Sequence, residues 1–130
     1  MKGQANEIKG NANKVDGKTN MVVGHENEVK NDNNFVAGDK NKLEGHQNDV
    51  AGSGNVVGGM KNSVVGGKNV VAGGTNKVTG FDNSVEGSKN AVKGKDNMAK
   101  GVENRLTGDR NIVEGDENKA TGSKNVAKGK

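Results

Sequence analysis

The sequence is built on one seven-residue repeat, and this repeat limits what the chain can fold into. From Gln4 to Gly129 the chain divides into 18 consecutive heptads without an insertion, each of the form x-x-Asn-x-Val-x-Gly. The third position is Asn in all 18 heptads, the fifth is Val, Leu, Ile or Ala, and the seventh is Gly in 17. The exception is Asn31. Because Asn readily replaces Gly where φ is positive, the repeat predicts a left-handed corner at each seventh position.

The spacing inside the heptad indicates a strand and excludes a coiled coil. A coiled coil needs two apolar positions per heptad, and this repeat offers one. A Gly in every heptad would also cost a helix about 1 kcal/mol each time. The Asn, the apolar residue and the Gly stand at i, i+2 and i+4, so a strand points all three to one side and the residues between them to the other. Each heptad is therefore expected to form a short strand and a corner, and two heptads a flattened coil.

We therefore predict an all-β fold, a β-solenoid (β-roll) of nine 14-residue coils that forms a single domain over residues 1–130. The fifth-position side chains would meet in a thin core, because hydrophobic residues make up only 28% of the chain, against roughly 45–50% in an ordinary globular domain. The Asn amides would stack along the axis and bond the coils above and below. Ala120 and Ala127 are expected to thin the core near the C-terminal end.

The charges support a coil of 14 residues. We call the outward surface of the even-numbered heptads the even face, and that of the odd-numbered heptads the odd face. The sixth position of the even heptads alternates in sign wherever it is charged: Asp16, Lys30, Glu44, Gly58, Ala72, Glu86, Lys100, Glu114 and Lys128. Since residues 14 apart would be neighbours in a stack, this column predicts ion pairs between coils.

The odd face has a different character. Its sixth position is small or β-branched and uncharged in seven of nine heptads: Val23, Ala37, Ala51, Val65, Thr79, Thr107 and Thr121. The even face has a weaker counterpart at its fourth position: Val56, Val70, Ser84, Met98, Ile112 and Val126. A flat apolar lane of this kind is either a binding surface or ordinary strand propensity on a solvent-facing side.

Other chemistry is poorly supported by the sequence. Without Cys there is no thiolate site, and His25 and His46 fall at corners on opposite sides, so we expect no metal, no cofactor and no enzyme activity. The 20 basic and 16 acidic residues are interleaved and aromatics are 2%, which argues against nucleic-acid binding. No apolar stretch resembles a signal peptide or a membrane span, so we expect a soluble chain that does not enter a membrane.

The heptad closely resembles the repeat of the ice-binding and ice-recrystallisation-inhibition proteins of cold-tolerant grasses. The segments GTNKVTG (74–80) and SKNAVKG (88–94) carry the resemblance, which covers nearly the whole chain. It implies a left-handed β-roll with an inner Asn ladder, a Val core and one flat ice-binding face, and an extracellular location. The family usually places Thr, Ser and Val on that face, and here charged residues replace many of them. We expect the face that binds ice and inhibits its recrystallisation to be the odd face, with the site at Val23, Ala37, Ala51, Val65, Thr79, Thr107 and Thr121.

Two alternative functions remain open from the sequence. The head domains of trimeric autotransporter adhesins are also similar to this chain, since they look like β-rolls built from Gly-punctuated heptads. A purely structural repeat without a ligand is the other alternative. The apolar lane around Val56 and Val70 would also allow two rods to pack face to face, so we expect a monomer or a weak homodimer.

Overall fold

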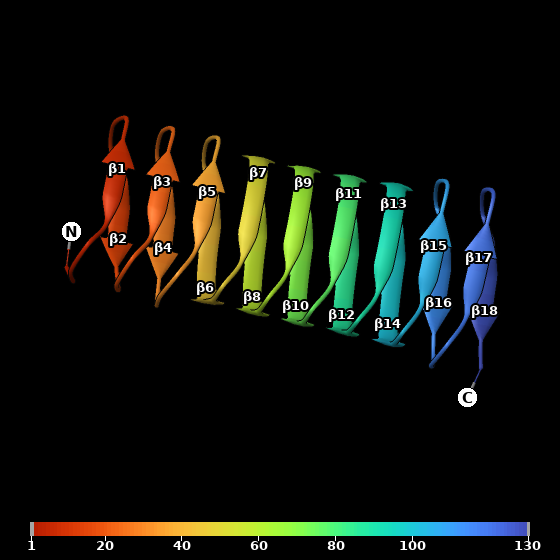
Figure 1. The fold of residues 1–130 in the computed structure, drawn as a ribbon. Coiled ribbons are helices and arrows are strands. Elements are labelled where there is room, and N and C mark those ends of the chain that lie inside the picture. Colours follow the sequence, from red (N-terminus) through yellow and green to blue (C-terminus); the bar gives the residue numbers. More distant parts are fainter. Residues whose placement is uncertain (1, 130) are drawn as a thin grey trace.

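The computed structural model describes residues 2–129 and contains one strand for each heptad (Figure 1). The strands are β1 (Glu7–Lys9), β2 (Lys14–Asp16), β3 (Met21–Val23), β4 (Glu28–Lys30), β5 (Phe35–Ala37), β6 (Lys42–His46), β7 (Asp49–Ser53), β8 (Val56–Met60), β9 (Ser63–Gly67), β10 (Val70–Gly74), β11 (Lys77–Phe81), β12 (Ser84–Ser88), β13 (Ala91–Lys95), β14 (Met98–Val102), β15 (Arg105–Thr107), β16 (Ile112–Glu114), β17 (Lys119–Thr121) and β18 (Val126–Lys128).

The strands form two parallel sheets that face each other along a rod (Figure 1). The odd-numbered strands make one nine-stranded sheet in chain order, and the even-numbered strands make the other. Neighbouring strands pair in a register of 14 residues, as where Val64 lies opposite Val78 and Val71 opposite Val85. The predicted all-β solenoid of nine 14-residue coils is therefore confirmed.

The core is a single apolar layer between the two sheets. It consists of the fifth-position side chains, and Val22, Leu43 and Val64 are fully buried in it. Burying each Val contributes roughly 1.5–3 kcal/mol as an upper estimate. The layer thins at both ends, where Ile8 and Ala127 are only partly buried. Because Ile8 in the first coil shows the same partial exposure and Ala120 is buried, this reflects the position of the two residues in the terminal coils, and thinning of the core by the small Ala side chains stays a prediction.

Two ladders of Asn side chains run along the axis, one inside each corner of the coil. Asn69 is representative: its Nδ2 donates to Asn55 Oδ1 at 3.0 Å and to the Gly80 carbonyl at 2.8 Å. Its Oδ1 accepts hydrogen bonds from the backbone N–H of Asn83 at 3.1 Å and from Asn83 Nδ2 at 2.9 Å. Within residues 2–129, every buried side-chain nitrogen and oxygen has a partner. The coil-to-coil bonds were predicted, and the bond to the glycine carbonyl shows that each amide also braces a corner.

The seventh-position corner requires glycine for two reasons, as Gly66 illustrates. Its φ is +125°, and a Cβ placed on it would overlap the Gly80 carbonyl oxygen of the next coil. Asn31 takes the same corner position with φ of 71° and accepts a hydrogen bond from Asn20 Nδ2 through its carbonyl at 2.7 Å. The left-handed conformation predicted from Asn31 is confirmed.

The second position of the heptad is also left-handed, which the sequence did not reveal. Lys61 and Thr75 have φ of 57° and 59°, although neither residue type favours that region. The strain costs about 1–2 kcal/mol per residue. A backbone hydrogen bond to the previous coil offsets it, as where the N–H of Thr75 donates to the Met60 carbonyl at 2.9 Å.

The Asn ladder generates a prediction for Asn69→Ala. This change leaves the Gly80 carbonyl and the backbone N–H of Asn83 without their side-chain partners inside a buried corner. We expect the free energy of unfolding to fall by about 2 kcal/mol or more, measured by urea denaturation followed by circular dichroism. Ser84→Ala, on the exposed side of β12, is the control and should leave stability nearly unchanged. Equal stability of the two variants would show that the ladder contributes little.

The corner geometry generates a second prediction, for Gly66→Ala. The added methyl group must displace the backbone of the next coil, so we expect a loss of more than about 2 kcal/mol in the same urea experiment. Gly58→Ala is the matched control, because a Cβ at Gly58 has no neighbour within 4 Å and its φ lies outside the left-handed region. It should be neutral or slightly stabilising. A similar loss in both variants would rule out the steric explanation.

Candidate functional site

The two outward faces are flat, regular arrays of side chains. Each strand presents its fourth and sixth heptad positions outward, so each face carries two columns of side chains that run along the rod. Neighbours within a column are about 4.7–4.9 Å apart, and the two columns are roughly 6.5–7 Å apart. The functional question is therefore which side chains occupy these columns.

The even face is dominated by ion pairs between coils. Its sixth-position column contains the pairs Lys30–Glu44 at 3.9 Å, Glu86–Lys100 at 3.7 Å and Glu114–Lys128 at 3.4 Å. The fourth-position column adds Lys14–Glu28 at 3.4 Å. The ion pairs predicted from the alternating signs are thus confirmed at both ends of the rod. Only two strands of this face have no charged outward residue. They are β8, with Val56 and Gly58, and β10, with Val70 and Ala72.

The predicted site residues of the odd face lie in one column. The register places five of them next to one another in consecutive coils: Val23, Ala37, Ala51, Val65 and Thr79. Thr107 and Thr121 are neighbours as well, but Lys93 separates them from Thr79. Val65 is 48% exposed, whereas Ala51 and Thr79 are half-buried. The structure therefore gives an uninterrupted lane of five residues and a separate pair.

The second column of the odd face divides the rod into two halves. Next to the five-residue lane stand Met21, Phe35, Asp49, Ser63 and then Lys77. Asp49 is the single charged residue among the outward positions of β3, β5, β7 and β9. We call the outward surface of these four strands the charge-poor patch. Basic residues enter from Lys77 onward.

Polar side chains at the corners tie neighbouring coils together. His25 Nδ1 accepts the backbone N–H of Asn11 at 3.2 Å, and His46 Nδ1 accepts that of Asp32 at 3.4 Å. The two histidines lie on opposite corners, as predicted. Residues 2–129 contain no group of three or more His, Cys, Asp or Glu side chains placed to hold a metal ion. No helix in the same range is long and apolar enough to cross a membrane.

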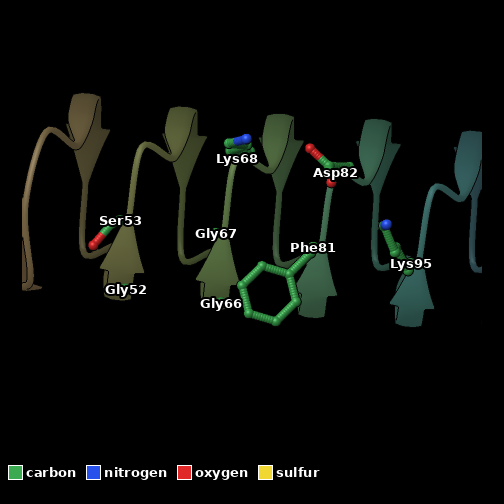
Figure 2. A pocket seen from close by; sticks show the side chains of 8 residues that line it. All are labelled: Gly52, Ser53, Gly66, Gly67, Lys68, Phe81, Asp82 and Lys95. Carbon is green, nitrogen blue, oxygen red and sulfur yellow. The ribbon is translucent and has the colours of Figure 1, made fainter.

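A shallow hollow of about 640 Å³ lies at one corner of the rod (Figure 2). Gly67 leaves a gap there, and the Phe81 ring of the next coil covers it, so that a Cβ on Gly67 would lie 3.2 Å from the ring. Ser53, Lys68, Asp82 and Lys95 complete most of the lining. These side chains do not form a nucleophile–base pair. This hollow was not predicted from the sequence, although a Gly and a Phe 14 residues apart at the first heptad position could have indicated it.

Comparison with known proteins bears on which function the scaffold serves. The model of a family described as the grass antifreeze β-roll matches residues 1–122. This confirms the predicted resemblance and does not favour the adhesin-like alternative. No curated protein matches the chain at a significant level. A crystal structure of the polySia-specific acetyltransferase NeuO covers 98% of this chain and 80% of its own, at 12% identity and a TM-score of 0.31, a level too low to bear on function.

The ion pairs of the even face generate a pH prediction. The hydrogen bond from Lys14 and its positive charge lower the pKa of Glu28. The pair therefore contributes stability above the ordinary pKa of a glutamate, and this contribution is lost as the pH falls through the lowered value. We expect Lys14→Gln to raise the pKa of Glu28 toward its ordinary value in an NMR titration. Lys77→Gln, on the other face, is the control; identical titration curves in both variants would contradict the pairing.

Proposed function

We propose that this chain, which belongs to the grass antifreeze β-roll family, adsorbs to ice through its odd face and inhibits ice recrystallisation. The observation that supports the proposal best is the lane of Val23, Ala37, Ala51, Val65 and Thr79, of which all but Thr79 lie in the charge-poor patch. The family match covers all the residues of the proposed site, including Thr107 and Thr121. The family also suggests that the protein acts outside the cell.

Ice demands an unusual binding surface. It has no charge and no concave shape to fill, so a ligand face must be flat, regular and weakly hydrated. The parallel register supplies the regularity, because outward side chains repeat at one strand spacing over the whole rod. The methyl groups of Val, Ala and Thr hold water loosely, and the Thr hydroxyls can anchor it through hydrogen bonds. An array of this kind can order water in two dimensions.

The even face is a poorer candidate for the same reasons. Ion pairs such as Lys30–Glu44 and Glu114–Lys128 occupy it near both ends of the rod. Charged groups bind water strongly and in orientations set by the charge, which does not match a lattice. When one charged outward residue is allowed, the longest run of charge-poor strands covers four consecutive strands of the odd face (β3 to β9, with Asp49) and three of the even face (β8 to β12, with Glu86).

The charged residues on the odd face determine how strongly we expect the protein to adsorb to ice. Asp49 lies beside Ala51, and Lys93 interrupts the lane between Thr79 and Thr107. These side chains should weaken adsorption without abolishing it. We therefore expect inhibition of recrystallisation to be clearer than depression of the freezing point.

The test introduces a charge into the lane and, separately, into the opposite face. Ala51→Lys and Val65→Lys place a long charged side chain in the middle of the proposed site, and both residues point away from the core. Ala72→Lys and Val70→Lys are matched changes on the even face. In a recrystallisation assay, we expect the odd-face variants to lose most of the inhibition and the even-face variants to keep it, with unchanged circular dichroism.

Two results would contradict this proposal. If ice grains coarsen in the presence of the parent protein as fast as in buffer, the protein does not inhibit recrystallisation. If the variants at Val70 and Ala72 lose inhibition while those at Ala51 and Val65 retain it, the site belongs on the even face.

A further inference from the structure

The C-terminal half of the odd face carries cations on four consecutive strands. Lys77 lies on β11, Lys93 on β13, Arg105 on β15 and Lys119 on β17, and all four are exposed. The outward positions of these strands contain no acidic residue. We call these four residues the basic stripe.

The basic stripe is not neutralised in the way the cations of the even face are. Lys30, Lys100 and Lys128 each pair with a Glu of a neighbouring coil. Among residues 2–129, none of the four stripe residues has a carboxylate oxygen within 4.0 Å of its charged nitrogens. Like charges on neighbouring strands destabilise a sheet, so the scaffold gains nothing from this arrangement.

Most corner acids beside the stripe are already engaged. Glu103 pairs with Lys89 at 2.7 Å, and Asp96 lies 4.0 Å from Lys95. Asp109 Oδ1 accepts a backbone N–H at 2.9 Å and Asp116 Oδ1 accepts one at 2.8 Å. Asp82 and Glu117 have no such partner in the described part of the chain. The outward positions of these four strands therefore carry four positive charges and no negative one, and the acidic residues named above lie at the corners.

We propose that the basic stripe binds a linear acidic polysaccharide, one that carries a carboxylate or sulfate on successive sugar rings. Lys77, Arg105 and Lys119 stand in the fourth-position column and Lys93 in the neighbouring sixth-position column, so the cations follow the rod axis at one per coil, about 4.7–4.9 Å apart along the axis, within a band two columns wide. A polymer that repeats its charge once per ring can lie along this band and meet several cations at once. Arg105 can bind a carboxylate or sulfate in bidentate fashion, and the lysines act as point charges.

The composition of the stripe argues against other anionic partners. A membrane surface is bound most firmly when apolar side chains insert beside the charges, and the outward positions of β11, β13, β15 and β17 offer only Ala and Thr besides the cations. Single-stranded nucleic acid favours aromatic stacking platforms. Of the two Phe residues, Phe35 lies on β5, and Phe81 ends β11 at a corner where its ring lies over Gly67, so neither occupies an outward position beside the stripe cations.

The experiment measures binding of the whole protein to sodium polygalacturonate by isothermal titration at low ionic strength. The test variant combines Lys77→Gln, Arg105→Gln and Lys119→Gln. The control variant combines Lys30→Gln, Lys100→Gln and Lys128→Gln, which removes the same charge from the even face. We expect the parent to bind in a salt-dependent manner, the test variant to bind about tenfold more weakly or worse, and the control to bind like the parent.

Three results would contradict the proposal that the basic stripe binds an acidic polysaccharide. Equal weakening in both variants would mean that net charge alone drives binding, and it would overturn the assignment to the stripe. Absence of binding by the parent, or stronger binding to phosphatidylserine vesicles than to the polymer, would overturn the choice of ligand. The changes tested for ice adsorption, at Ala51 and Val65, lie outside the stripe, so the two proposals can fail independently.

Discussion

The side-chain amides of the third-position asparagines hold the coils in register, and the rest of the structure depends on this. The interior amide of Asn69 makes four side-chain hydrogen bonds: one to Asn55 of the coil before it, one to the Gly80 carbonyl at the corner of the coil after it, and two from Asn83 of that same coil. The apolar layer between the sheets is only one side chain thick and is not directional. A shift of one residue would expose the valines and leave the amides without partners, so the ladder and the core specify the same register.

Once the register is fixed, the inside and outside of the rod become independent. The inward positions are occupied by Asn, an apolar residue and Gly, and each meets a steric or hydrogen-bonding demand. The outward side chains are not needed for core packing or for the Asn ladder. Their chemistry can therefore differ between the two faces. The even face neutralises itself with ion pairs, and the odd face separates into a charge-poor patch and a basic stripe. Both proposals follow from this difference between two otherwise equivalent sheets.

Much of the fold could be predicted from the sequence because each heptad repeats the same local rules. The strand, the buried valines such as Val64, the Asn ladder and the left-handed Asn31 all follow from a pattern of seven residues. The left-handed second position was missed, because residues such as Thr75 occupy it against their own preference and a hydrogen bond from another coil compensates. The columns of the candidate site could also be predicted, because the seven-residue repeat fixes which positions point outward and the 14-residue coil fixes which of them are neighbours. The interruption of the lane by Lys93 could also be placed from the 14-residue coil, whereas the hollow at Gly67 and Phe81 depends on how one ring folds over a corner.

The central claim is that buried Asn amides join the coils, and hydrogen exchange of the side-chain NH₂ groups tests it most directly. In this structure Asn55, Asn69 and Asn83 are almost fully buried and their Nδ2 atoms donate to the neighbouring coil and to a corner carbonyl. NMR should therefore show that their side-chain amide protons exchange far more slowly than those of a free asparagine, with protection similar to that of the backbone N–H of Val64. Exchange of these side-chain protons at the rate of a free asparagine, while the backbone remains protected, would contradict the account.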